Sequence, residues 1–134
     1  MRSLFALFLT VALAFAAPSQ RDALITAKRE AQNDYTAAQR TKDKDKFIAA
    51  ANRFREVGQK VAEANQAMIR RIESNGGRRV EQDHLKPLKA SLQSLGNFIL
   101  PTELSPESVR SVDRYIREID QAIEVHHAAS LNIR

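Results

Sequence analysis

Residues 47–68, FIAAANRFREVGQKVAEANQAM, carry the clearest periodicity in the chain. Large apolar residues recur there at seven-residue intervals, and smaller apolar residues lie between them. The recurring positions are Phe47, Ala50, Phe54, Val57, Val61, Ala64 and Met68. They are the a and d positions of a heptad, which lie along one face of an α-helix. The stretch therefore predicts a long amphipathic helix whose large side chains fill a core between helices.

Three other segments show apolar stripes at helical spacing and predict further amphipathic helices. The first, from Ser19 to about Arg40, has its stripe at Leu24, Ala27, Ala31, Tyr35 and Ala38. The next after the heptad segment runs from Asp83 or His84 to about Leu100 and has Leu85, Leu88, Leu92, Leu95 and Ile99, with Phe98 beside them. The last begins at Ser105 and has Val109, Val112, Ile116, Ile119, Ile123 and His126. The fold class predicted from these stripes is all-α, with His126 a partly exposed histidine at the end of the core.

The helix boundaries are marked by residues that cap or end helices. Residues 41–46 contain no apolar side chain, and one helix over 19–74 would be about 84 Å long at about 1.5 Å per residue, so we expect a break with Thr41 or Asp43 as N-cap. The glycines of residues 75–77 should end the heptad helix, and Pro101 the following one. Ser105 and Pro106 are a capping hydroxyl and a proline suited to the first helical turn. Four helices with short connections predict an antiparallel up-down-up-down four-helix bundle.

The first residues have the features of a secretory signal peptide. A positive tip at Arg2 precedes an uncharged, strongly apolar stretch over residues 4–13, which ends at Ala14-Phe15-Ala16. A membrane-spanning helix needs about 20 apolar residues, whereas a signal peptide needs only about 7 to 15 before a small-residue cleavage site. We expect cleavage after Ala16, which would leave residues 17–134 as a single helical-bundle domain that is secreted and has no transmembrane span.

The composition suits a helical fold held together by packing. The chain has 134 residues and no cysteine, so a small secreted domain made from it has no disulfide to stabilise it. Its net charge is +5, and the charges are unevenly distributed. Residues 17–100 contain sixteen Lys and Arg against ten Asp and Glu, and residues 101–134 contain four against six. This asymmetry favours either pairing between the two segments or an acidic partner.

No stretch has the spacing of a known catalytic motif. The sequence lacks the G-x-S-x-G, P-loop and H-E-x-x-H patterns, so we expect no catalytic residue, no cofactor and no enzymatic activity. Glu81-x-x-His84 and Glu124-x-x-His127 do have the spacing of ligands in di-iron helical bundles. However, Glu124 and His127 fall one position past the apolar stripe, about 100° around the helix, and Glu81 precedes the predicted helix. We expect capping and surface roles for these residues, and no metal site.

Four arginines are the candidate contact residues. Arg70 and Arg71 fall in the last turn of the heptad helix, where the helix dipole favours cations, and Arg78 and Arg79 follow the glycine turn. Together they predict a positive hairpin tip that could contact a sulfated glycan, an anionic lipid headgroup or an acidic protein surface. Nucleic acid is not expected as a partner, because no aromatic side chains accompany these arginines.

The function expected from these features is binding. We expect a secreted, non-enzymatic helical protein that acts as an extracellular signalling, effector or inhibitory module. The alternative is an extracellular carrier of lipid or of another apolar small molecule. The apolar stripes are narrow and rich in alanine, which favours packing of helix on helix over a broad lipid-binding face.

Overall fold

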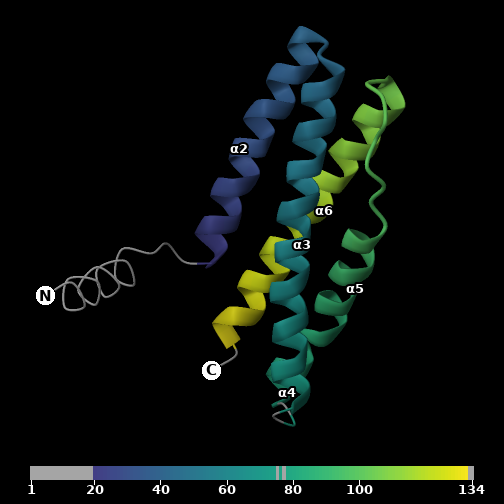
Figure 1. Ribbon diagram of the computed structural model, residues 1–134. Coiled ribbons are helices and arrows are strands. Elements are labelled where there is room, and N and C mark those ends of the chain that lie inside the picture. The colour runs from purple at the N-terminus through teal and green to yellow at the C-terminus, as the bar shows by residue number, and fades with distance from the viewer. Residues whose placement is uncertain (1–19, 75, 77, 133–134) are drawn as a thin grey trace, which may run out of the picture.

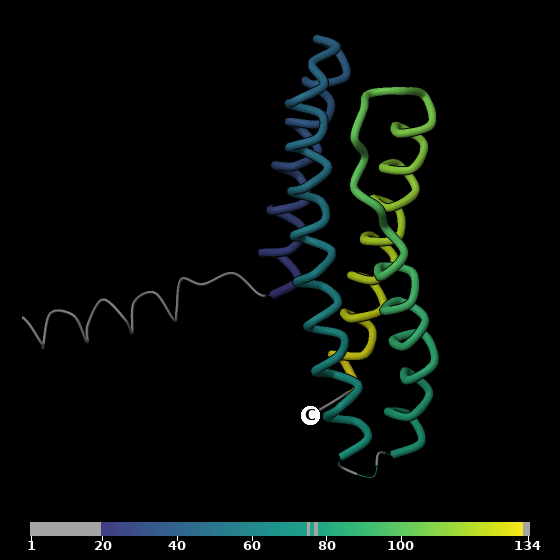
Figure 2. Tube along the Cα trace, turned by 45° about the vertical axis from the view of Figure 1, so that its right-hand side comes forward, coloured from purple at the N-terminus to yellow at the C-terminus, as the bar shows by residue number. Residues whose placement is uncertain are grey.

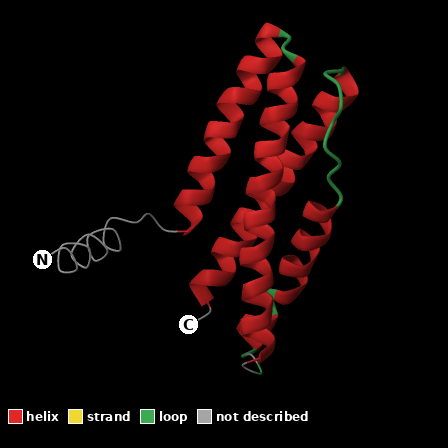
Figure 3. Ribbon diagram, viewed as in Figure 1, coloured by secondary structure: helices red, strands yellow, loops and turns green. Residues whose placement is uncertain are grey.

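The computed structural model describes residues 20–74, 76 and 78–132, and all the regular structure in this part of the chain is helical (Figure 3). The helices are α2 (Gln20–Thr41), α3 (Lys44–Ser74), α4 (Arg79–Gln82), α5 (Leu85–Gly96) and α6 (Pro106–Asn132). The predicted all-α fold is therefore confirmed. The predicted signal peptide, residues 1–16, and the predicted helix start at Ser19 lie outside the described residues.

Four of the helices are long enough to pack along one another, and successive ones run in opposite directions (Figure 1). Helices α2 and α3 form one antiparallel pair, and α5 and α6 form a second pair beside it (Figure 2). Helix α3 is the central element, since it packs against α2, α5 and α6. In the described part of the chain, no helix has both the length and the apolar character needed to cross a membrane.

The break between α2 and α3 falls at the predicted polar segment. Helix α2 ends at Thr41, and Lys42 follows with a left-handed φ of 56°. The carboxylate of Asp43 accepts the backbone N–H of Lys46 at 3.1 Å, so Asp43 is the N-cap of α3. The sequence proposed either Thr41 or Asp43 for this role. The structure selects Asp43, because the Thr41 hydroxyl instead donates to the Ala37 carbonyl of its own helix.

The apolar stripes meet in two separate regions of core. The larger region contains Phe47, Phe54 and Val61 of α3, all fully buried, together with buried residues of α2, α5 and α6. The smaller region lies between the second half of α3 and the helices α5 and α6 and contains Ile69, Ile72, Leu88 and Ala129. The predicted heptad positions are thus buried from Phe47 through Ala64.

Met68, predicted as a core residue, is only half-buried, and Ile69 and Ile72 are buried instead. A straight α-helix drifts by about 20° for every seven residues, so a strict heptad stripe rotates away from a fixed neighbour after several repeats. Helix α2 packs on the first part of α3, and the smaller core region on the second part faces α5 and α6. The face of α3 that must be apolar therefore changes along its length.

The third predicted helix is shorter than expected and is preceded by an additional turn of helix. Helix α5 ends at Gly96, so Ile99, predicted in its stripe, is 82% exposed. Glycine is costly inside a helix, and beyond it the ring of Phe98 stacks on Tyr115 with centroids 4.0 Å apart, which holds the chain in a non-helical path. The short helix α4 was not predicted. The last helix begins as expected, with the Ser105 hydroxyl accepting the Ser108 N–H at 3.1 Å.

Candidate functional site

The four predicted arginines lie at one end of the molecule, which we call the basic end: Arg70, Arg71, Arg78 and Arg79. Arg70 and Arg71 are in the last turns of α3, Arg78 is the N-cap residue of α4, and Arg79 is its first residue. All four side chains are exposed. Figure 1 shows α4 at the same end of the molecule as the end of α3, so the chain turns back on itself there. The four predicted arginines thus lie at the end of α3 and the start of α4, on either side of the same turn.

Arg78 differs from the other three because it is bound within the chain. Its Nε donates to Glu81 Oε1 at 2.9 Å, and its Nη2 donates to the carbonyl of Asn132 at 3.2 Å. Glu81 was expected on the surface but is only 8% exposed, because α4 packs against α6. Arg78 therefore fastens α4 to the end of α6.

Arg70, Arg71 and Arg79 have no side-chain hydrogen bond or ion pair to any other described residue. Lys89 is paired with Glu73 at 2.9 Å, so that nearby lysine is already partly neutralised. Three free guanidinium groups thus remain at the basic end. A free guanidinium presents its planar fork of donors to solvent and suits the oxygens of sulfate, phosphate or carboxylate.

The turn that carries the basic end is closed by local contacts. Gly76 has a left-handed φ of 67°, which glycine adopts without strain. Gln82 Nε2 donates to the Gly76 carbonyl at 3.3 Å. His84 Nε2 accepts a hydrogen bond from the side-chain amide of Asn132 at 2.9 Å, which is a second contact to the end of α6. The first contact holds the turn to α4, and the second holds the start of α5 to the end of α6.

The carboxylates of the two E-x-x-H pairs have different partners in the structure. Glu81 is paired with Arg78, whereas Glu124 lies on α6 and is paired with Arg21 at 2.7 Å. Among the residues that the structure describes, no group of three His, Cys, Asp or Glu side chains could hold a metal ion. The arrangement gives these carboxylates roles as ion-pair partners of arginines.

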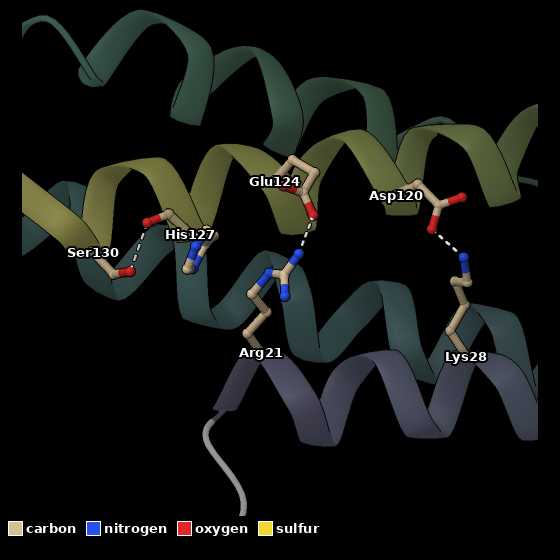
Figure 4. Close-up of polar contacts among 6 residues, drawn as sticks. All are labelled: Arg21, Lys28, Asp120, Glu124, His127 and Ser130. Atoms are coloured by element: carbon tan, nitrogen blue, oxygen red, sulfur yellow. Dashed lines mark hydrogen bonds and ion pairs between the residues drawn. The ribbon is translucent and has the colours of Figure 1, made fainter.

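Polar contacts that were not predicted join α2 to α6. Arg21 pairs with Glu124 and Lys28 pairs with Asp120, so basic residues of α2 face acidic residues of α6 (Figure 4). Further along, the Tyr35 hydroxyl donates to Asp113 Oδ1 at 2.7 Å. Burial is the main cause that raises the pKa of Tyr35, and the hydrogen bond to Asp113 raises it further. Arg21, Lys28 and Tyr35 are again seven residues apart. The two ion pairs neutralise part of the excess positive charge of residues 17–100 with carboxylates of residues 101–134.

A buried polar cluster joins α3, α5 and α6. Asn65 is fully buried, and its Nδ2 donates to Ser91 Oγ at 2.9 Å and to the Ala122 carbonyl at 3.3 Å. Its Oδ1 lies 2.9 Å from His126 Nδ1, and since this oxygen can only accept, the His126 proton is on Nδ1. Burial, and secondly the charge of His127, lowers the pKa of His126 below its ordinary value. His126 is thus a neutral core histidine, more buried than expected.

Comparisons with known proteins give no relative from which a role could be carried over. The chain matches no family model, no curated protein and no solved structure.

Proposed function

We propose that the chain is a secreted, non-enzymatic helical protein that acts by binding and that it contacts an anionic partner through the basic end. The observation that carries the proposal is the contrast between Arg78, which is fixed by Glu81 and Asn132, and three neighbouring arginines that have no partner among the described residues. Arg78 thus stabilises the turn, whereas Arg70, Arg71 and Arg79 are exposed to solvent. The module could serve signalling, effector or inhibitory roles.

The partner that suits these guanidinium groups carries several sulfate or phosphate groups on one surface. A guanidinium binds the oxygens of a sulfate or phosphate with two parallel hydrogen bonds. Several such groups on one partner would add their contributions, as on a sulfated glycan or an anionic phospholipid surface. Val80 and Leu131, 55% and 71% exposed, are large apolar side chains next in sequence to Arg79 and Asn132. A lipid surface would also accommodate these two side chains.

Retention on immobilised heparin tests the basic end. We expect the triple variant Arg70→Ala, Arg71→Ala, Arg79→Ala to elute at lower salt than the wild type. The matched control removes three other exposed arginines, Arg110, Arg114 and Arg117 of α6, which have no partner among the described residues. It changes the net charge by the same amount and should elute close to the wild type. Equal elution of the two triple variants would show that only total charge matters.

The source of the anion is decided by a second binding assay. Co-sedimentation with vesicles that contain an anionic phospholipid, compared with neutral vesicles, measures binding to a lipid surface. If the wild type binds heparin and not the anionic vesicles, the partner is a glycan type of polyanion. If neither probe is bound in a manner that depends on the basic end, the proposed contact is rejected.

The proposed export rests on the sequence of residues 1–16. When the full chain is expressed in a secreting cell, we expect the protein in the medium to begin at Ala17, as measured by N-terminal mass analysis. A charged substitution in the apolar stretch, Leu9→Asp, should retain the precursor in the cell. Secretion of an uncleaved chain would contradict the proposal.

The alternative function is a carrier of lipid or another apolar small molecule. It needs a hollow with an apolar lining, and the described residues form one at the end of the molecule opposite the basic end. Native mass spectrometry of the protein from its natural source separates the classes. A bound lipid would favour the carrier, a bound iron ion would favour an enzyme, and the absence of both would favour the binding module.

A further inference from the structure

A cleft of about 560 Å³ lies between the turn that joins α2 to α3 and the segment that leads into α6. Both segments lie at the same end of the molecule, away from α4 (Figure 1). The lining of the cleft includes Gln39, Lys42, Lys44, Leu104, Pro106 and Val109. A hollow of this size falls within the range of about 300 to 1,000 Å³ that is typical of small-molecule sites.

The cleft has an apolar side and a basic side. Leu104 and Val109 are half-buried and pack against the main core, so they form a fixed apolar surface, and Pro106 extends it. The hydroxyl of Ser105, which also lines the cleft, is already used to cap α6. Gln39, Lys42 and Lys44 come from the other lining segment, the end of α2 and the start of α3.

The polar side chains of the cleft are not used elsewhere. Gln39, Lys42, Lys44 and the single lining carboxylate, Glu103, have no side-chain hydrogen bond or ion pair to another described residue. The nearby carboxylate of Asp43 is used to cap α3. The lining therefore carries two free ammonium groups and one carboxylate, an excess of positive charge beside an apolar surface.

Lys42 is held at the cleft at an energetic cost. Its φ of 56° is in the left-handed region, where glycine is the usual residue after a helix and where a lysine is strained. Lys44 is the first residue of α3, and a cation near a helix N-terminus is also disfavoured by the helix dipole. Neither lysine is therefore explained by the stability of the turn, and both line the same cleft.

We propose that this cleft binds a small amphiphilic anion, a molecule with one carboxylate and an unbranched apolar body. The carboxylate would lie at the ammonium groups of Lys42 and Lys44, and the apolar body would lie on Leu104, Pro106 and Val109. This inference depends neither on the export of the chain nor on the basic end, and it gives a ligand class to the carrier alternative.

Titration with three probes of equal chain length tests the charge requirement. Decanoate, decanol and decyltrimethylammonium are each added below their micelle concentrations, and backbone amide chemical shifts are followed by NMR. We expect decanoate to shift the amides of residues 41–44 and 103–109 with the lowest Kd of the three. If the cation binds as tightly as decanoate, or if the shifts fall elsewhere on the chain, the proposal is wrong.

Substitution of the lysines separates binding from folding. Lys42→Gln with Lys44→Gln removes two exposed charge contacts and should raise the Kd for decanoate about tenfold, which is about 1.4 kcal/mol for the pair. Lys60→Gln with Lys86→Gln removes two exposed lysines outside this cleft and should leave the Kd unchanged. Lys42→Gly should raise the melting temperature, because it relieves the left-handed strain, and should still weaken decanoate binding. Stronger or unchanged binding by Lys42→Gly would overturn the proposal.

Discussion

A β-carbon added at Gly58 would lie 1.8 Å from the hydroxyl oxygen of Tyr115 and 2.7 Å from its Cζ. Tyr115 cannot easily move away, because it is buried and its ring is stacked on Phe98. Because Gly58 has no side chain, the Tyr115 ring of α6 can pack directly against the backbone of α3. Burial is the main cause that raises the pKa of Tyr115 to about 12, which accords with an uncharged hydroxyl in this contact.

We predict that Gly58→Ala destabilises the protein. Alanine favours a helix over glycine by about 1 kcal/mol, but overpacking of a filled site costs about 1 to 3 kcal/mol. The two effects together should lower the free energy of unfolding by up to about 2 kcal/mol, measured by urea denaturation. The control is Gly96→Ala at the end of α5, where an added β-carbon meets nothing within 4 Å. If Gly58→Ala is as stable as the control, the contact with Tyr115 is not tight.

Removal of the Asn65 side chain should be more costly than its size suggests. In Asn65→Ala the Nδ1 proton of His126 loses its acceptor inside the protein, whereas Ser91 keeps its bond to the Leu88 carbonyl at 2.6 Å. An unsatisfied buried donor costs about 1 to 3 kcal/mol, so we expect a loss of about 2 to 3 kcal/mol in the free energy of unfolding.

Asn52→Ala, on the same helix, is the matched control for this prediction. Asn52 makes its contacts with Glu56 and Arg55 at the surface, so its loss should change stability by no more than about 0.5 kcal/mol. Adding His126→Ala to Asn65→Ala should cost less than the sum of the two single changes, because the second substitution removes the stranded donor. Strict additivity would show that the two side chains are not coupled.

Much of the helical architecture could be predicted because it depends on short-range patterns. The stripe from Phe47 to Val61, the cap at Asp43 and the start at Ser105 each involve residues within a few turns of one another. The errors occur where the environment changes. Met68 is only half-buried at the edge of the smaller core region because α3 meets different neighbours along its length. Ile99 is exposed because the chain leaves the helix where Phe98 stacks on Tyr115 of α6.

The candidate site could be predicted only in part for the same reason. The four arginines are close in sequence, so their shared position at a turn followed from the glycines between them. That Arg78 is engaged and the others are free depends on Glu81 being covered by α6 and on the carbonyl of Asn132, a residue far along the chain. The cleft beside Lys42 likewise joins two segments more than fifty residues apart, for which the sequence has no local pattern.

The ion pair between Arg21 and Glu124 should contribute little to stability. The Glu124 side chain is 60% exposed and the Arg21 side chain 34%, so solvent and salt reach the pair and screen its attraction. A double-mutant cycle with Arg21→Met and Glu124→Gln should give a coupling energy of about 0.2 to 1 kcal/mol at low salt, and less in molar salt. A coupling above about 2 kcal/mol would show that α2 is held to α6 chiefly by charge. The expected result leaves α3 as the main support of α2, in keeping with their shared core.

His126 should make the folded protein sensitive to acid. Burial, followed by the charge of His127, lowers the pKa of the folded imidazole below the ordinary value of 6.5. The unfolded chain therefore takes up a proton at a higher pH than the folded chain does. The free energy of unfolding should be at its full value above the unfolded pKa, and should fall as the pH drops from there towards the lowered folded pKa.

The loss of stability at low pH can be assigned to His126 by substitution. Urea denaturation from about pH 8 to about pH 5 should show a His126 contribution of at most about 1.4 kcal/mol per pH unit, the limit for one proton. His126→Asn keeps a donor for Asn65 but does not titrate, so the variant should be less stable at pH 8 and lose this contribution below it. His84→Gln, which changes a histidine bonded to Asn132 outside the buried cluster, should keep it. Since the Nδ1 proton is already donated to Asn65, the second proton must bind at Nε2. If His126→Asn loses as much stability at low pH as the wild type does, protonation of this nitrogen is not what destabilises the fold.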